Sequence, residues 1–255
     1  VKPGDRVFIY LERMPELYYF VLGILKCGAI YCPLFSSFGS EAVRHRLDDC
    51  QGSLIITQKH LAENISDIKS IIIDDDNFIN NFESQSNEFV VFESSDEDIA
   101  IIHYTSGTTS KPKGVMHCHR AIVNHNSSAR EIFGLNESDI YWCTADPAWV
   151  TGSSYGIFAP LSVYATVVVC DPGLRLTQIF TVLEQYKINI WCTAPTLLRM
   201  IMREDPDKMK NFDLSSLRKA FSIGEALNPN IIEWFEDSVG LPVYDTWFQT
   251  ETGSI

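Results

Sequence analysis

Residues 99–115 read IAIIHYTSGTTSKPKGV, and this stretch governs how the chain is organised. Its first seven residues predict an apolar strand that runs into a loop of small hydroxyl and glycine residues. Such a loop presents approachable backbone N–H groups and hydroxyl donors, which a polyphosphate needs. Lys111 and Lys113 add positive charge on either side of Pro112. The loop does not match the P-loop motif GxxxxGK[ST], so an ordinary solvated loop is an equally good reading of these residues alone.

Strands and helices alternate on both sides of this stretch. Upstream, a helix is predicted over residues 15–26, with Pro15 at its start and Gly28 just past its end, and Ser40 is predicted to cap a second helix. Downstream, helices are predicted over residues 120–133, 176–186 and 229–238. The apolar runs between the helices predict strands at residues 7–11, 29–34, 53–57, 70–74, 166–170, 188–195, 219–224 and 242–251. This alternation predicts an α/β fold with helices on the faces of parallel sheets.

An acidic stretch separates the two series of elements. Residues 74–98 contain nine acidic residues and no basic residue, which accounts for most of the net charge of −13. We interpret it as a solvated connector. The sequence therefore predicts a first α/β subdomain over residues 1–95, ending in the connector, and a second over residues 96–255. The pattern opens and stops abruptly, so we expect a piece of a longer protein.

Composition narrows the function class. Without a cluster of lysine and arginine, a nucleic-acid partner is not expected. The seven cysteines form no CxxC pair and mostly sit in apolar runs, which favours a reducing, cytoplasmic compartment. Residues 17–35 are apolar enough to raise the question of a membrane span, but Cys27, Gly28 and Pro33 divide them into a helix and a strand. The group formed by His117, Cys118, His119 and His125 lacks zinc spacing and is read as structural.

The full string of residues 104–115, YTSGTTSKPKGV, resembles the phosphate-binding signature of the adenylate-forming superfamily, which includes acyl-CoA synthetases, luciferases and peptide-synthetase adenylation domains. Ser110 stands where glycine is commoner. Two further segments resemble the family in the expected order. Residues 222–229, SIGEALNP, resemble the loop that packs on adenine, and residues 244–253, YDTWFQTETG, resemble the region that binds the nucleotide and Mg²⁺.

By position, the resemblance implies a nucleotide site and a metal ligand. The residues implied to bind ATP or AMP are Thr105, Ser106, Gly107, Thr108, Thr109, Lys113, Gly224, Glu225, Ala226, Asp245, Thr246, Trp247, Phe248, Gln249 and Thr250. Glu251 is implied to hold Mg²⁺, which takes one or two carboxylates plus substrate phosphates. Thr250, Glu251 and Lys113 are the implied catalytic residues.

A finer resemblance points to the acetyl-CoA synthetase branch. Residues 142–161, WCTADPAWVTGSSYGIFAPL, and residues 245–253, DTWFQTETG, are similar to stretches of that branch, although tryptophan is usual at the position of Phe248. The resemblance implies an acyl pocket formed by Val150, Thr151, Ile223 and Phe248, with Thr151 also contacting coenzyme A. Read without the family, these apolar positions are plain core.

The resemblance implies ATP-dependent activation of acetate to acetyl-AMP and then to acetyl-CoA, with ATP, Mg²⁺ and coenzyme A. It implies small-molecule substrates as partners, without nucleic acid or membrane. It also implies two stacked α/β subdomains of an incomplete N-terminal domain. The small C-terminal domain would lie beyond Ile255, so residues 1–255 alone are expected to be inactive. Two alternatives stay open: activation of propionate or another short or medium-chain acid, and a non-catalytic nucleotide-binding remnant.

Overall fold

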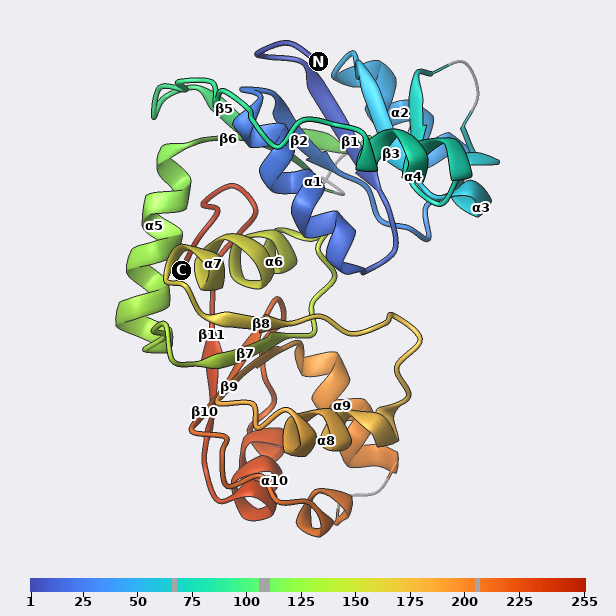
Figure 1. Cartoon of the computed structure of the whole chain (residues 1–255). Helices are drawn as coiled ribbons and strands as arrows, with labels where there is room; N and C mark the ends of the chain where they lie inside the picture. Colours follow the sequence, from blue (N-terminus) through green and yellow to red (C-terminus); the bar gives the residue numbers. More distant parts are fainter. Residues whose placement is uncertain (66–67, 106–110, 205–206) are drawn as a thin grey trace. The chain divides into compact units, whose positions relative to one another are not determined.

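A computed structural model shows how the chain folds, and it describes residues 1–65, 68–105, 111–204 and 207–255. The chain divides into two compact units, unit 1 (Val1–Arg120) and unit 2 (Ala121–Ile255). Figure 1 shows a sheet with flanking helices in each unit. The predicted α/β class with two sheets is confirmed.

Unit 1 is built on a six-stranded sheet in the order β4–β3–β1–β2–β5–β6. All neighbours are parallel except β6, which runs antiparallel to β5. The strands are β1 (Arg6–Tyr10), β2 (Ile30–Pro33), β3 (Leu54–Thr57), β4 (Ser70–Ile72), β5 (Ile99–Thr105) and β6 (Lys113–Cys118). The helices are α1 (Pro15–Lys26), α2 (Ser40–Asp49), α3 (Lys59–Ala62) and α4 (Asp76–Glu83).

Two helices of unit 1 test the predicted helix ends. The helix predicted over residues 15–26 is confirmed as α1, which has proline in its first turn and buries Leu17, Val21 and Ile24 on one face. The predicted cap at Ser40 is wrong: Gly39 is the N-cap residue of α2 and Ser40 is its first helical residue. The tight entry to α2 is therefore formed by glycine, and no side chain caps it.

The acidic stretch contains one regular element. Helix α4 begins after Asp75, whose side chain accepts a hydrogen bond from the backbone N–H of Asn77. None of its residues is buried, although the Phe78 ring lies 6.0 Å from that of Phe20 in α1. The side-chain cap by Asp75 and the acidic Asp76 in the first turn both favour the start of this exposed helix.

The division between the two units falls later in the sequence than the predicted boundary between residues 95 and 96. They divide after Arg120, because β5 pairs with β2 and β6 pairs with β5 in the sheet of unit 1. His117 and Cys118 lie in β6, and the helix predicted from residue 120 begins at Arg120. The domain division of the protein as a whole stays a prediction.

Unit 2 is built on a five-stranded parallel sheet in the order β11–β10–β9–β7–β8. Its strands are β7 (Ile140–Cys143), β8 (Thr166–Val168), β9 (Ile190–Thr193), β10 (Lys219–Ile223) and β11 (Val243–Thr246). The helices along this part of the chain are α5 (Arg120–Ser128), α6 (Val150–Ser153), α7 (Ala159–Ser162), α8 (Leu176–Gln185), α9 (Pro195–Glu204) and α10 (Pro229–Val239), with a 3-10 turn η3 (Lys208–Asn211). Two π-helical segments, η1 (Ala129–Phe133) and η2 (Ser154–Phe158), continue α5 and α6.

Alternation along the strands places the core of unit 2 on both faces of its sheet. Trp142 and Trp191 point to the face covered by α8, α9 and α10. Their neighbours Cys143 and Cys192 point to the other face, where they pack with side chains from η1, η2 and α7. A strand buried on both faces reads as a continuous apolar run, which explains the runs YWC and IWC. The second face is the one that reaches the candidate site.

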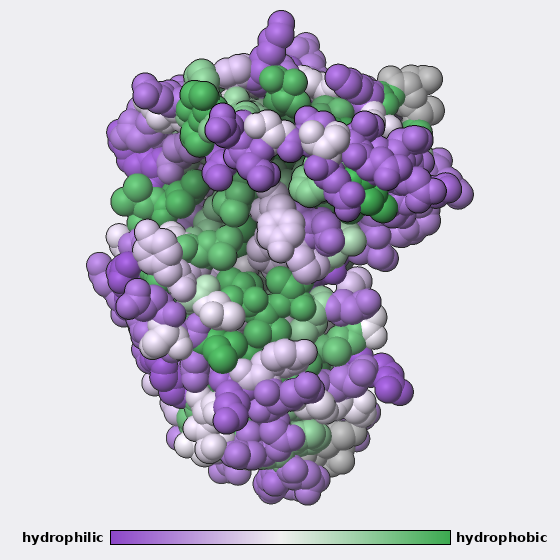
Figure 2. All heavy atoms as spheres, viewed as in Figure 1, coloured by the Kyte–Doolittle hydropathy of each residue, from purple (hydrophilic) through white to green (hydrophobic). Residues whose placement is uncertain are grey.

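On the face drawn in Figure 2, hydrophilic residues cover much of the surface, and hydrophobic patches are also exposed. In the part of the chain that the structure describes, none of the helices has the length and apolar character needed to cross a membrane.

Candidate functional site

Two of the segments implied to bind nucleotide lie side by side in unit 2. Strands β10 and β11 are adjacent and parallel, with Ile223 opposite Thr246. The residues that follow β10 and those that follow β11 therefore leave the sheet at the same edge. Ligands of open α/β sheets bind outside the carboxyl ends of the strands. The two segments thus converge where the fold favours a ligand, while the roles of the individual residues stay predictions.

Polar side chains tie these two strand ends together. The Asp245 carboxylate accepts a hydrogen bond from the backbone N–H of Leu227 (3.2 Å), which fixes the loop after β10. The Thr246 hydroxyl donates to the carbonyl oxygen of Ser222 (3.0 Å). Gly224 has a φ of +106°, a conformation that side-chain-bearing residues rarely adopt. In this structure Asp245 and Thr246 therefore organise the loops.

The side chains around the predicted nucleotide differ in how open they are. The Glu225 carboxylate accepts a hydrogen bond from the Thr196 hydroxyl (2.7 Å) and lies 3.6 Å from the Arg199 guanidinium, so it is tied to α9. Trp247 is 73% exposed, so its indole ring is available to a ligand at this edge. The Trp247 ring is thus free to contact a ligand at this edge, whereas the Glu225 carboxylate already interacts with Thr196 and Arg199.

Thr250 and Glu251 occupy the centre of a closed turn. The Gln249 carbonyl oxygen accepts hydrogen bonds from the backbone N–H groups of Thr252 (3.1 Å) and Gly253 (3.0 Å). The Gln249 N–H donates to the Thr252 hydroxyl oxygen (3.1 Å). Among the described residues, the bonds that close the turn, residues 249–252, involve Gln249, Thr252 and Gly253 and neither of its two central side chains.

The Glu251 carboxylate suits a magnesium ion that arrives with its substrate. It is exposed, and among the described residues it has no hydrogen-bond or ion-pair partner. The described residues also contain no group of three or more His, Cys, Asp and Glu placed to hold a metal. Mg²⁺ commonly takes one or two carboxylates and completes its shell with water and phosphate oxygens. A lone open carboxylate fits that coordination, with phosphates as the remaining ligands.

The four residues implied to form the acyl pocket all lie in unit 2. Ile223 is buried, and Phe248 packs against the same cluster of side chains. The Phe248 ring meets the ring of Tyr155 edge to face at 5.5 Å. Val150 and Thr151 begin α6, the helix that η2 continues and that carries Tyr155 one turn further on. Ile223 and Phe248 are thus brought together, and Tyr155 links them to the helix of the other two.

Two of the residues implied to bind phosphate are described in unit 1. Thr105 ends β5 and pairs with Lys113 at the start of β6. Lys113 is exposed, and among the described residues its ammonium group has no hydrogen-bond partner. Ser106, Gly107, Thr108 and Thr109 lie outside the described residues. The phosphate-binding role of this loop stays a prediction.

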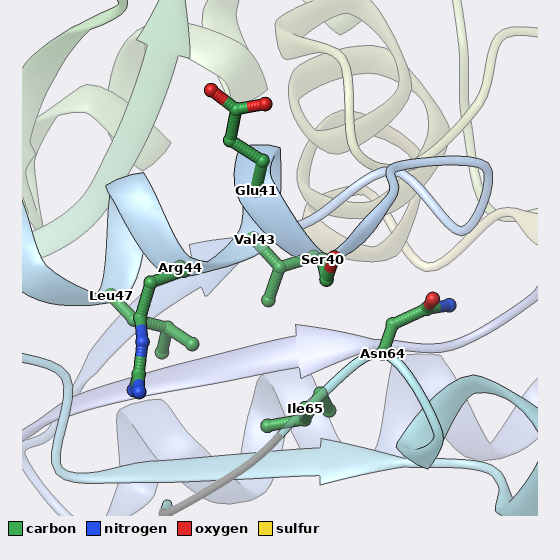
Figure 3. A pocket seen from close by; sticks show the side chains of 7 residues that line it. All are labelled: Ser40, Glu41, Val43, Arg44, Leu47, Asn64 and Ile65. Carbon is green, nitrogen blue, oxygen red and sulfur yellow. The ribbon is translucent and has the colours of Figure 1, made fainter.

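Unit 1 also contains a cavity of about 260 Å³, lined by Ser40, Glu41, Val43, Arg44 and Leu47 of α2 and by Asn64 and Ile65 (Figure 3). The Glu41 and Arg44 side chains extend in opposite directions in this view, so their charges do not converge on one ligand position. None of these residues belongs to the motifs described above.

Sequence reasoning missed the residues that hold the Glu251 segment in place. His125, Ser154 and Tyr155 bond to the backbone of residues 253–255, across sequence separations of 99 to 128 positions. His125 was weighed as a metal ligand and read as structural, and Ser154 and Tyr155 carry no motif of their own. Burial raises the pKa of the Tyr155 hydroxyl, while its bonds with Ser128 and the Ile255 backbone oppose that shift. Only packing reveals these contacts.

The chain resembles known proteins over its whole length. The family model described as "AMP-binding enzyme" matches residues 1–255. The chain is 39% identical over 268 residues to the acetyl-coenzyme A synthetase of Bacillus subtilis, covering 100% of this chain and 47% of that protein. It is 34% identical over 291 residues to the acetyl-coenzyme A synthetase of Rubrobacter xylanophilus, covering 100% of this chain and 45% of that protein.

A solved structure agrees as well. The crystal structure of Brucella canis acyl-CoA synthetase superposes with a TM-score of 0.90 at 30% identity, covering 98% of this chain and 48% of the other. The chain therefore spans about half the length of the relatives that it matches. The resemblance to acetyl-CoA synthetases, inferred from the motifs, is confirmed. Because the family model covers every residue, the chain belongs to the AMP-binding enzyme family.

Proposed function

We propose that this protein is an AMP-forming acid–thiol ligase that activates acetate. An acetate oxygen attacks the α-phosphorus of ATP, pyrophosphate leaves, and acetyl-AMP forms. The thiolate of coenzyme A then attacks the acyl carbon, and AMP leaves. The observation that carries the proposal is the closed turn at residues 249–252, which presents Thr250 and Glu251 at the shared edge of β10 and β11 beside Phe248. The similarity to acetyl-coenzyme A synthetases supports the choice of acid.

The chain contributes positioning and charge rather than a covalent intermediate. The Thr250 hydroxyl would donate to the α-phosphate. The Glu251 carboxylate would hold Mg²⁺, and that ion would supply positive charge beside the phosphates. The Lys113 ammonium serves as a point charge for the β- and γ-phosphates, a role that a flexible lysine fills well. Trp247, open to solvent, offers its ring to the adenine.

The acid is selected by the apolar surface that Ile223 and Phe248 provide. The relatives' branch usually carries tryptophan at the position of Phe248, and phenylalanine leaves more room at the pocket floor. The Ile223 side chain belongs to the cluster against which Phe248 packs, and it limits that room. One methylene in an apolar pocket discriminates by about 1–3 kcal/mol. We therefore expect acetate to be the best substrate, with appreciable use of propionate and poor use of butyrate and longer acids.

The test of the proposed function is acid-dependent exchange of labelled pyrophosphate into ATP by the full-length protein, measured for acetate, propionate, butyrate and hexanoate. Exchange that is fastest with acetate is the expected result. Tight binding of ATP, measured by calorimetry, without exchange for any acid would favour a non-catalytic nucleotide-binding protein. Fastest exchange with a longer acid would place the protein elsewhere among the acyl-CoA synthetases.

Replacing Phe248 with glycine is expected to open the pocket floor and to shift preference toward longer acids. Acetate use should fall because the methyl group loses its contact surface. The measurement is kcat/KM for the same four acids in the wild type and in Phe248→Gly. Phe248→Trp is the matched control, and it should strengthen the preference for acetate over the longer acids. Identical ranking of the acids in all three proteins would show that Phe248 is not the floor of the pocket.

A further inference from the structure

The carbonyl oxygen of Gly253 accepts two hydrogen bonds from distant parts of unit 2. One comes from the Ser154 hydroxyl in η2 (2.8 Å) and the other from Nε2 of His125 in α5 (2.9 Å), which must carry a proton to donate. Two residues further on, the Ile255 N–H donates to the Tyr155 hydroxyl oxygen (2.8 Å). Side chains of α5 and η2 therefore hydrogen-bond to the backbone directly after the turn that carries Thr250 and Glu251.

The three side chains that make these hydrogen bonds are buried and are held by contacts of their own. His125 and Ser154 are each 2% exposed, and Tyr155 is fully buried. The His125 ring stacks on Phe158 with the centroids 6.0 Å apart and the ring planes 13° apart. Tyr155 stacks on Phe133 at 4.9 Å and shares a hydrogen bond with the Ser128 hydroxyl (3.0 Å). Groups locked by packing on both sides have little freedom to follow a moving partner.

Gly253 links the hydrogen bonds from His125 and Ser154 to the turn. Its N–H donates to the Gln249 carbonyl oxygen and so closes the turn, while its carbonyl oxygen accepts from His125 and Ser154. Its φ of +77° lies in the left-handed region that favours glycine. The residues of the turn are exposed or half-buried, whereas Gly253 is buried. The turn therefore takes its position from Gly253 more than from packing of its own.

We propose that His125 and Ser154 are positioning residues for adenylation: by fixing the Gly253 carbonyl, they set the places of the Thr250 hydroxyl and the Glu251 carboxylate. This inference rests on the proposed function of the turn. Neither side chain acts on the substrate itself. Buried polar groups are almost always hydrogen-bonded, so these bonds would also occur in a purely structural role. The distinction is whether losing them moves the turn and slows the chemistry in a protein that is still folded.

The test compares variants of the full-length protein that differ in one donor. Ser154→Ala removes one donor with little change in volume, and His125→Leu removes the other. His125→Gln keeps an N–H at a similar distance from the backbone and is the rescue variant. Ser127→Ala is the matched control, because the Ser127 hydroxyl is exposed and, among the described residues, bonds within α5 to the carbonyl oxygen of Val123.

We expect kcat for acetate-dependent pyrophosphate exchange to fall about 100-fold in the double variant Ser154→Ala/His125→Leu, since an error of about 1 Å in position can have that effect. The KM for ATP should change much less, and the Mg²⁺ concentration for half-maximal rate should rise. A protein with His125→Gln in place of His125→Leu should recover most of the lost kcat. The kcat of Ser127→Ala should equal that of the wild type. An unchanged kcat in a folded double variant, or a loss that follows only the folded fraction, would overturn the proposal.

Hydrogen exchange of the backbone amides gives a readout that does not depend on activity. In the double variant the Thr252 and Gly253 amides should exchange at least about tenfold faster, because they close the turn, while the amides of β9 keep their wild-type rates. If the wild type shows no pyrophosphate exchange, the proposed function fails. Faster amide exchange would then still show that His125 and Ser154 fix the turn, and unchanged amide exchange would overturn that as well.

Discussion

Replacing Glu251 with glutamine is expected to lower acetate-dependent pyrophosphate exchange by about 100-fold or more, with the fold intact. The substitution keeps the size of the side chain and removes the charge that is proposed to hold Mg²⁺. Glu251 is exposed, and its replacement breaks no hydrogen bond or ion pair among the described residues. The measurement is exchange rate against Mg²⁺ concentration, together with a thermal unfolding curve.

Glu233→Gln is the matched control for this prediction. Glu233 lies on α10 with an exposed side chain and, like Glu251, has no hydrogen-bond or ion-pair partner within the described ranges. Its replacement changes the net charge by the same amount and should leave exchange at the wild-type rate. Wild-type exchange by Glu251→Gln at saturating Mg²⁺ would rule out the metal assignment.

Replacing Gly152 with alanine is expected to destabilise unit 2 by about 3 kcal/mol or more. A Cβ atom on Gly152 would lie 1.9 Å from the backbone oxygen of Asp146 and 2.3 Å from its carbonyl carbon. That oxygen accepts a hydrogen bond from the Trp149 N–H (3.0 Å), so the backbone cannot swing aside without losing the entry to α6. Since α6 carries Val150 and Thr151, the use of acetate should weaken as well.

Gly156→Ala provides the control, one helical turn further along. A Cβ there would meet the Cys143 side chain at 3.5 Å, an ordinary van der Waals contact. Its unfolding free energy should stay within about 1 kcal/mol of the wild type, because alanine is favoured over glycine in a helical segment. Urea unfolding curves of the two variants test the difference. Equal stability would show that the loop before α6 yields to the added atom.

Several features of the site could be predicted because they depend on short stretches of chain. The apolar run of residues 99–105 predicted a strand, which β5 confirms, while the phosphate-binding role of the residues after it stays a prediction. The segments at residues 222–229 and 244–253 were recognised by motif, and adjacent parallel pairing of β10 and β11 places them at one edge. The resemblance supplied the residue roles, which composition and spacing alone left open.

Other features could not be predicted, because the sequence does not show which partner a group will find. Ser40 has the right residue type for a helix cap, but the chain enters α2 at Gly39. The strand predicted over residues 242–251 ends at Thr246, and residues 249–252 form a turn instead.

The sequence by itself determined the α/β class and the family to which the chain belongs, because hydrophobic periodicity and contiguous motifs are encoded over a few residues at a time. The tertiary structure decided where unit 1 ends, since β5 and β6 complete a sheet begun far upstream. It also decided what holds Gly253, because His125 and Ser154 reach that carbonyl across 128 and 99 positions of the chain. A hydrogen bond depends on distance in space, and only the packed fold determines that distance.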